Sequence, residues 1–220
     1  MVWRQNFKVL VGLISVVLVF GTVAQATVLD FNGSICGGAC SNGLTIDQTY
    51  GDIAGQLDVA YAHRVASGNS ASDEAFLKWW DTGYSNLTNV AWGGIDGSGV
   101  SEIKLIPAAG FKVTLNSFDL GAFGGDRGSQ ETVYDASYAS LQSSGATTIN
   151  GVTASTFAIG LTNASGLIIQ WGPESTNVGI DNINFTVEAI PSNGVPEPST
   201  LLLIATGFGI LGYGWRRRRA

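Results

Sequence analysis

Two cysteines, Cys36 and Cys40, are the only thiols in the 220-residue chain, and three residues separate them. The two glycines between them let the chain bend enough to bring both sulfurs together. Such a pair can form a disulfide, act as a redox couple or supply half of a metal site. A zinc site needs about four ligands, usually Cys or His, and His63 is the sole histidine. We therefore expect a structural disulfide that closes a small loop, with the redox couple and the metal site as alternatives.

The residues that could catalyse a reaction form no recognisable set. A Gly-x-Ser-x-Gly nucleophile elbow is absent, and one histidine leaves few ways to build a hydrolase triad. His63 lies in an alternating segment typical of a strand, where a structural role is the commoner one. A glycosidase needs only two carboxylates, and the many acidic residues leave that alternative open without marking a pair. We expect no enzymatic activity.

Aromatic side chains could bind sugars, because their faces pack on the apolar side of a pyranose ring. The candidates for a carbohydrate-binding surface are Trp79, Trp80, Trp92, Tyr84 and Trp171. The adjacent Trp79 and Trp80 cannot both be buried on one face, so one of them is expected to be exposed. A large apolar side chain left in solvent suggests a contact surface. The alternative is that these rings belong to the core, which is the commoner fate in a β-sandwich.

The elements that must position these residues are strands. In the segment 57–65, apolar and polar side chains alternate with the period of a half-buried strand. Short apolar segments bounded by Gly, Ser, Asn and Pro turns predict seven more strands, at 28–31, 102–106, 111–120, 132–134, 156–161, 167–171 and 179–187. One short helix is expected at 73–80, with Ser72 as its N-cap. About eight to ten strands spaced roughly ten residues apart predict an antiparallel β-sandwich or jelly roll.

Residues 1–26 have the features of a secretory signal peptide. Arg4 and Lys8 give a positively charged start, residues 9–23 are apolar, and Ala24-Gln25-Ala26 is an A-x-A cleavage site. The mature chain is expected to begin at Thr27, with an uncleaved N-terminal anchor as the alternative. Export would place the cysteines in an oxidising compartment, which favours the disulfide.

The chain from residue 191 onward has three parts in a fixed order. A linker, 191–198, ends in Val195-Pro196-Glu197-Pro198, and an apolar segment follows at 199–215. Two prolines so close together exclude a helix, so the membrane helix is expected to begin after Pro198. Its 17 residues lie at the lower end of what spans a bilayer. The tail 216–220 holds Arg216, Arg217, Arg218 and Arg219, and such basic clusters stay on the cytoplasmic side.

A Pro-Glu-Pro motif, a short hydrophobic helix and a basic cluster in this order resemble the PEP-CTERM sorting signal of Gram-negative bacteria. The resemblance covers residues 195–220. In that family, the tail is implied to be recognised and processed by a membrane-embedded exosortase, in cells that usually make a polysaccharide matrix. The resemblance implies an inner-membrane anchor before processing and then sorting to the cell surface or the matrix. An ordinary membrane anchor without processing is the alternative.

The charge of the central region limits its partners. From Thr27 to Gly194 the chain carries 16 acidic and five basic side chains, a net charge of −11. Such a charge repels phosphate backbones, so no nucleic-acid partner is expected. Acidic exported domains attract divalent cations or simply stay soluble. Residues 27–190 are long enough for one domain with its own core.

A second resemblance concerns the ends of this domain. Residues 28–31, Val-Leu-Asp-Phe, and residues 178–185 are similar to the opening and closing strands of extracellular jelly-roll modules, including carbohydrate-binding ones. In such modules the two strands often pair, and their acidic residues can ligate a structural calcium. The resemblance implies that Asp30 and Asp181 are calcium ligands, with backbone carbonyls completing the roughly six to eight oxygens that calcium takes. The alternative is that Asp181 caps a loop or faces solvent.

These features predict an exported, non-enzymatic surface or matrix protein with a structural or adhesive role. A second hypothesis is a calcium-stabilised carbohydrate-binding module that recognises the exopolysaccharide of its own cell. A third is a hydrolase that acts on that matrix. The expected partners are an exosortase-type enzyme, the inner membrane and the exopolysaccharide. No cofactor is expected apart from the structural calcium of the second hypothesis.

Overall fold

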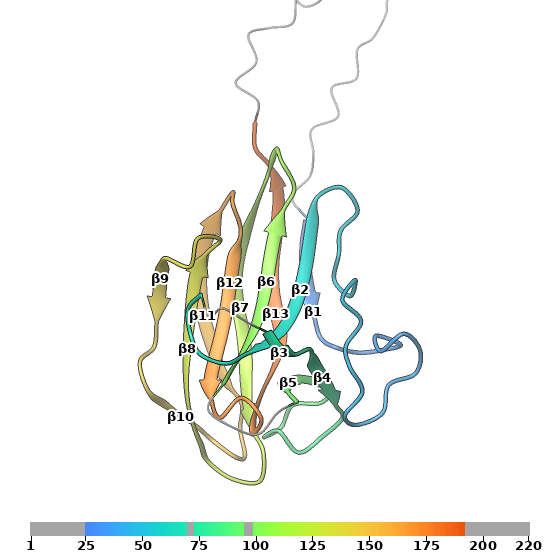
Figure 1. The fold of residues 1–220 in the computed structure, drawn as a ribbon, viewed down its shortest axis with the longest axis vertical. Helices are drawn as coiled ribbons and strands as arrows, with labels where there is room; N and C mark the ends of the chain where they lie inside the picture. The colour runs from blue at the N-terminus through green and yellow to red at the C-terminus, as the bar shows by residue number, and fades with distance from the viewer. Residues whose placement is uncertain (1–24, 70–72, 95–98, 192–220) are drawn as a thin grey trace, which may run out of the picture.

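A computed structural model describes residues 25–69, 73–94 and 99–191. These residues form two antiparallel β-sheets, and they contain no helix (Figure 1). In the same three ranges no helical segment is long and apolar enough to span a bilayer. Most of the expected signal peptide, up to Ala24, and the expected membrane helix at 199–215 lie outside the described residues.

Sheet A has six strands, and five of them follow the order β11-β7-β13-β5-β4. The sixth, β1, pairs with β13 on the same side as β5, opposite to β7. Its strands are β1 (Gln25–Leu29), β4 (Leu77–Trp80), β5 (Val90–Gly93), β7 (Phe111–Ala122), β11 (Ser155–Asn163) and β13 (Val178–Ala189). Sheet B has seven strands in the order β10-β8-β12-β6-β2-β3, with β9 paired to β8. Its strands are β2 (Leu57–Arg64), β3 (Asp73–Ala75), β6 (Val100–Pro107), β8 (Arg127–Asp135), β9 (Ser140–Ser143), β10 (Thr147–Ile149) and β12 (Leu167–Pro173).

All eight predicted strands are confirmed, because each overlaps a strand of one of the two sheets. The alternation on β2 has the expected effect: Leu57, Val59 and Tyr61 are buried, whereas Asp58 is exposed. Buried side chains of both sheets enclose one core, in which Trp171 and Phe118 are fully covered. The two sheets therefore form the β-sandwich that the strand pattern predicts.

The predicted helix at 73–80 is wrong. This segment forms β3 and β4, of which β3 pairs with β2 and β4 pairs with β5. The capping serine and the charged first turn are weak local signals, and strand pairing to distant segments outweighs them. Trp79 and Trp80 also favour extended chain, since aromatic residues fit the pleated surface of a sheet.

Both ends of the described chain lie at the same end of the sandwich. Gln25 pairs with Val187, and the Ile190 amide donates to the Gly110 carbonyl at 2.8 Å. Figure 1 shows β12 ending and β13 beginning at the opposite end, which we call the distal end. Because β1 begins at Gln25, a chain cleaved before Thr27 would keep the pairs that Thr27, Val28 and Leu29 make with β13.

The outer face of sheet B buries a carboxylate. Glu102 is fully buried, and its Oε1 lies 3.2 Å from both Arg64 Nη1 and Lys104 Nζ. The Tyr138 hydroxyl donates to the same oxygen at 3.1 Å, and Gln170 Nε2 donates to Oε2 at 2.5 Å. Each carboxylate oxygen therefore has a partner, which offsets the cost of removing the charge from water.

Gln170 also connects this network to the loop that follows β2. Its Nε2 donates to the Gly68 carbonyl at 2.9 Å, and its Oε1 accepts from the Gly68 amide at 2.8 Å. Both the nitrogen and the oxygen of the Gln170 side-chain amide are thus hydrogen-bonded. It fixes the loop of residues 65–69 over the outer face of sheet B.

Glu102→Ala is expected to lower the free energy of unfolding by about 3–5 kcal/mol, because it leaves Arg64 and Lys104 without their shared counter-charge. Urea denaturation measures this loss. The matched control is Glu188→Ala, which breaks the exposed pair with Lys112 at 3.0 Å and should cost at most about 1 kcal/mol. Equal, small losses for both variants would contradict a structural role for the network.

Candidate functional site

A cluster of aromatic rings forms a pocket of about 150 Å³ at the distal end, which we call the aromatic pocket. Its lining residues are Trp80, Tyr84, Trp92, Phe123, Thr176 and Asn177. The Trp80 ring stands edge-on to Trp92 and to Phe123, with centroid distances of 5.8 and 6.0 Å. Trp80 and Trp92 are half-buried, and Phe123 is 37% exposed. Aromatic surface therefore remains accessible in a pocket that the rings themselves hold in shape.

Polar groups without protein partners lie beside these rings. The buried Trp92 Nε1 finds no hydrogen-bond acceptor among the described residues. The side-chain amide of Asn177 likewise makes no hydrogen bond within the part of the chain that the structure describes. The Asn177 amide therefore offers both a donor and an acceptor at the pocket, whereas Trp92 Nε1 is covered by protein. The Tyr84 hydroxyl fixes the neighbouring loop by donating to the Thr176 carbonyl at 2.8 Å.

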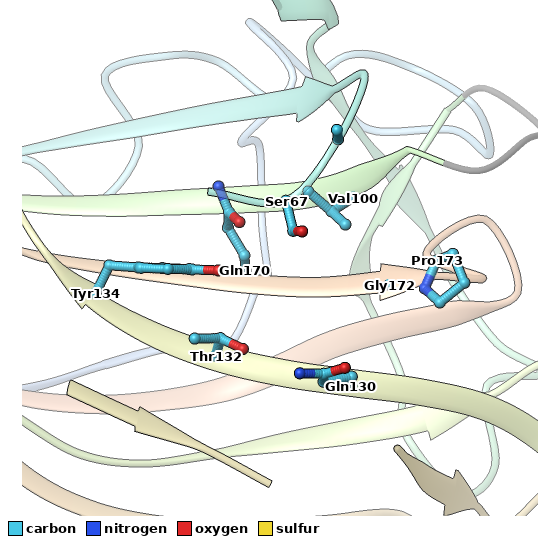
Figure 2. Close-up of a pocket in the computed structure, with 9 residues that line it drawn as sticks. Ser67, Val100, Gln130, Thr132, Tyr134, Gln170, Gly172 and Pro173 are labelled. Carbon is cyan, nitrogen blue, oxygen red and sulfur yellow. The ribbon is translucent and has the colours of Figure 1, made fainter. Parts of the chain in front are cut away.

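A second pocket, of about 240 Å³, lies on the outer face of sheet B (Figure 2). We call it the sheet pocket. It is lined by Ala66, Ser67, Val100, Gln130, Thr132, Tyr134, Gln170, Gly172 and Pro173, and none of these side chains is charged. Gln130, Thr132 and Tyr134 share this face because alternate residues of β8 point the same way.

A third pocket, of about 420 Å³, brings three carboxylates to one place, and we call it the acidic pocket. Its lining residues are Asp30, Asn32, Asn86, Leu87, Thr88, Asp119, Thr153, Ala154, Thr156, Asp181 and Asn182. A bulge in β13 shifts the register between Asp181 and Asn184, and Asn182 has a positive φ of 51°. Because of the extra residue, Ile180 and Ile183 both remain fully buried although they are three positions apart.

The electrostatics of the acidic pocket centre on Asp181, which is only 4% exposed. Burial, together with the nearby charges of Asp30 and Asp119, raises the pKa of Asp181 to about 7 against the hydrogen bond from the Asn182 amide. By contrast, hydrogen bonds from Asn32 lower the pKa of Asp30. One carboxyl of the pocket is therefore held partly protonated near neutral pH.

The structure brings together some of the residues that the sequence singled out. Asp30 and Asp181 line one pocket, as a shared calcium site would require. In residues 25–69, 73–94 and 99–191, however, no three His, Cys, Asp or Glu side chains are arranged as a metal-binding group. Calcium binding stays a prediction. Cys36 and Cys40 form the expected disulfide, with their Cα atoms 5.3 Å apart.

The candidate aromatic residues do not share one surface. Trp171 is fully buried in the core, and Tyr84 lines the aromatic pocket. Trp79 packs against the main core, and its Nε1 donates to the Phe31 carbonyl at 3.0 Å. Trp80 and Trp92 belong instead to the separate aromatic pocket. Adjacent side chains of β4 thus point to opposite faces. Both are half-buried, and only Trp80 lines the aromatic pocket.

Several pocket residues were not anticipated from the sequence. Asp119, Phe123 and Asn177 join the pockets through pairing between distant strands, such as Asp119 with Asp181. Tyr134 could have been found, because it alternates with Thr132 along a predicted strand. The predicted sorting motif and the basic cluster lie outside the described residues. They comprise Val195, Pro196, Glu197 and Pro198, and Arg216, Arg217, Arg218 and Arg219.

The family model of the PEP-CTERM protein-sorting motif matches residues 194–219. The chain carries a PEP-CTERM sorting signal. This signal implies export, a membrane-anchored precursor and processing by an exosortase. It covers the C-terminal segment alone, so the PEP-CTERM match leaves the function of the sandwich open.

No curated protein gives a significant match to this sequence. Among solved structures, the chain is similar to the Podospora anserina GH26-CBM35 beta-(1,4)-mannanase, with 16% identity and a TM-score of 0.34 over 64% of this chain and 29% of that one. It is also similar to the Northeast Structural Genomics Consortium target SoR45, with 14% identity and a TM-score of 0.14 over 63% and 90% of the two chains. Both TM-scores are too low to support a shared fold or function.

Asp181 makes the stability of the domain depend on pH. Because its pKa rises from 3.8 to about 7 on folding, its protonated form favours the folded state, and this stability is lost as the pH rises from about 4 to about 7. Asp181→Asn should remove that part of the dependence. Thermal unfolding of both proteins across this range measures it.

Burial raises the pKa of Glu131 as well, so the wild-type stability alone does not isolate the effect of Asp181. The difference in stability between the wild type and Asp181→Asn isolates it. The exposed Asp58→Asn serves as the matched control and should track the wild type. A wild-type minus Asp181→Asn difference that does not vary with pH would refute the assignment.

Proposed function

We propose that this PEP-CTERM protein is a non-catalytic, adhesive protein that binds a polysaccharide outside the cell through the aromatic pocket. Its sandwich would remain on the membrane precursor until an exosortase acts, and would then reside at the surface or in the matrix. The alternation of β6, β7 and β8, and of β11, β12 and β13, between the two sheets supports the jelly-roll interpretation of the fold.

The observation that carries the proposal is the exposed aromatic surface of Trp80 and Phe123 beside unused hydrogen-bonding groups. A sugar ring offers an apolar face to aromatic carbon and hydroxyls to polar groups, and the aromatic pocket provides both. The Asn177 amide can both donate to and accept from sugar hydroxyls. Since the rings pack against one another, little conformational entropy is lost when a sugar binds.

The position of the aromatic pocket also suits adhesion. The chain leaves the sandwich toward the sorting signal after Ile190, at the end where β1 and β13 meet. The aromatic pocket lies at the distal end, where β7 and β12 end. Its residues Phe123, Thr176 and Asn177 come after the C-terminal ends of these strands. An anchored precursor would therefore present the pocket away from the membrane.

A structural calcium in the acidic pocket remains a second part of the proposal. Asp30, Asp119 and Asp181 line the same polar pocket, and carboxylate, amide and hydroxyl oxygens are the ligands that calcium prefers. A bound cation would also relieve the repulsion that raises the pKa of Asp181. Because β1, β7 and β13 each contribute to this pocket or adjoin it, such an ion would tie three strands of sheet A together.

Trp80→Ala should weaken binding of the full-length protein to the host's extracellular polysaccharide about tenfold, since it removes an aromatic contact of roughly 1–1.5 kcal/mol. Co-sedimentation with the insoluble polysaccharide measures the affinity. The control is Phe76→Ala, which removes a 55% exposed ring outside the pocket and should bind normally. Unchanged binding by Trp80→Ala, or turnover of the polysaccharide, would contradict the proposal.

Calcium at 100 times its dissociation constant should stabilise the protein by about 2.7 kcal/mol, which appears as a rise in Tm. The rise should be largest above pH 7, where Asp181 is ionised. Asp181→Asn should lose it, whereas Asp58→Asn should keep it. A Tm that calcium leaves unchanged in the wild type would remove the ion from the proposal.

A further inference from the structure

The sheet pocket is built to make hydrogen bonds, and its own hydroxyls are available for them. Neither the Tyr134 hydroxyl nor the Ser67 hydroxyl is hydrogen-bonded to another described residue. In Figure 2 the Tyr134 ring lies along the floor with its hydroxyl toward Gln170, and Ser67 points down from the loop above. Gln130 adds an exposed amide, which donates to Ser143 Oγ at 3.0 Å and keeps its oxygen for a ligand.

The walls of this pocket are held in place before any ligand arrives. Gln170 fixes Gly68, and with it the loop that carries Ala66 and Ser67, while Glu102 fixes Gln170 from behind. A site whose walls are fixed before the ligand arrives loses little entropy on binding. The buried network thus has a consequence for recognition as well as for stability.

The chemistry of the lining selects a neutral ligand. The lining offers hydroxyl, amide and aromatic groups and no charge. The cations Arg64 and Lys104 both pair with Glu102 and are not part of the lining. The net charge of −11 between Thr27 and Gly194 adds a general repulsion against polyanions.

The sheet pocket also adjoins the aromatic pocket along the chain. Gly172 and Pro173 line the first, and Thr176 and Asn177 line the second, so one six-residue segment borders both. At no more than about 3.6 Å per residue, this segment keeps the two linings within roughly 20 Å of each other. A polysaccharide chain can bridge such a distance.

We propose that the sheet pocket is a second saccharide site, specific for neutral sugar units, that engages the same polysaccharide chain as the aromatic pocket. This inference rests on the proposed function. Tyr134 and Ser67 are contact residues, and Glu102 is a positioning residue that acts through Gln170. Two sites on one chain raise the overall affinity because the second binding event becomes intramolecular.

The test uses full-length protein in detergent and the host's extracellular polysaccharide, separated by anion exchange into a neutral and an acidic fraction. The protein should bind the neutral fraction. Tyr134→Phe and Ser67→Ala should each weaken that binding about threefold to tenfold, as expected for loss of one hydrogen bond. The control, Thr148→Ala, removes an exposed hydroxyl of β10 outside the pocket and should leave binding unchanged.

The outcomes separate this inference from the proposed function. Two outcomes would overturn the second site alone. One is preferential binding to the acidic fraction. The other is wild-type binding by Tyr134→Phe and Ser67→Ala together with weakened binding by Trp80→Ala. Failure to bind either fraction would overturn the proposed function itself. Because Tyr134→Phe keeps the ring, and an unchanged Tm verifies its fold, weaker binding by this variant reports the lost hydroxyl.

Discussion

The buried carboxylate of Glu102 is the constraint on which the outer face of sheet B depends. A charge buried away from water is costly unless it is paired and hydrogen-bonded. Four side chains from separate parts of the chain contact this carboxylate. Through Gln170 the same requirement fixes the 65–69 loop, which forms one wall of the sheet pocket. A polar network that costs energy to bury thus gives this face of the sandwich a defined shape.

The chain ends and the aromatic pocket lie at opposite ends of the sandwich. Its first and last strands pair at one end, from which the chain continues to the PEP-CTERM signal. The aromatic pocket is built at the other end, from residues that follow β7 and β12. Antiparallel strands that run the length of the domain make this separation possible, because each strand that ends near the anchor begins near the pocket. The chain thus carries a sorting signal after the sandwich and an aromatic pocket at the distal end.

Local patterns in the sequence were enough for the strands, the disulfide and the sorting signal. They failed at 73–80, where a cap and a charged turn suggested a helix but pairing with β2 and β5 decided the structure. The placement of Asp30 beside Asp181 followed from recognising paired end strands, yet Asp119 did not, because its position depends on the register of β7 with β13. The Glu102 network could not be predicted from the sequence either, since its contacts join residues up to 68 positions apart.

The central claim is that the aromatic pocket holds a sugar, and the indole N–H resonances of the tryptophans test it most directly. Full-length protein labelled with nitrogen-15 is titrated with soluble fragments of the host polysaccharide. The account predicts that the Trp80 and Trp92 signals shift, while those of Trp79 and Trp171, whose indoles donate to main-chain carbonyls, stay in place. A titration that leaves Trp80 and Trp92 unmoved at saturating fragment would contradict it.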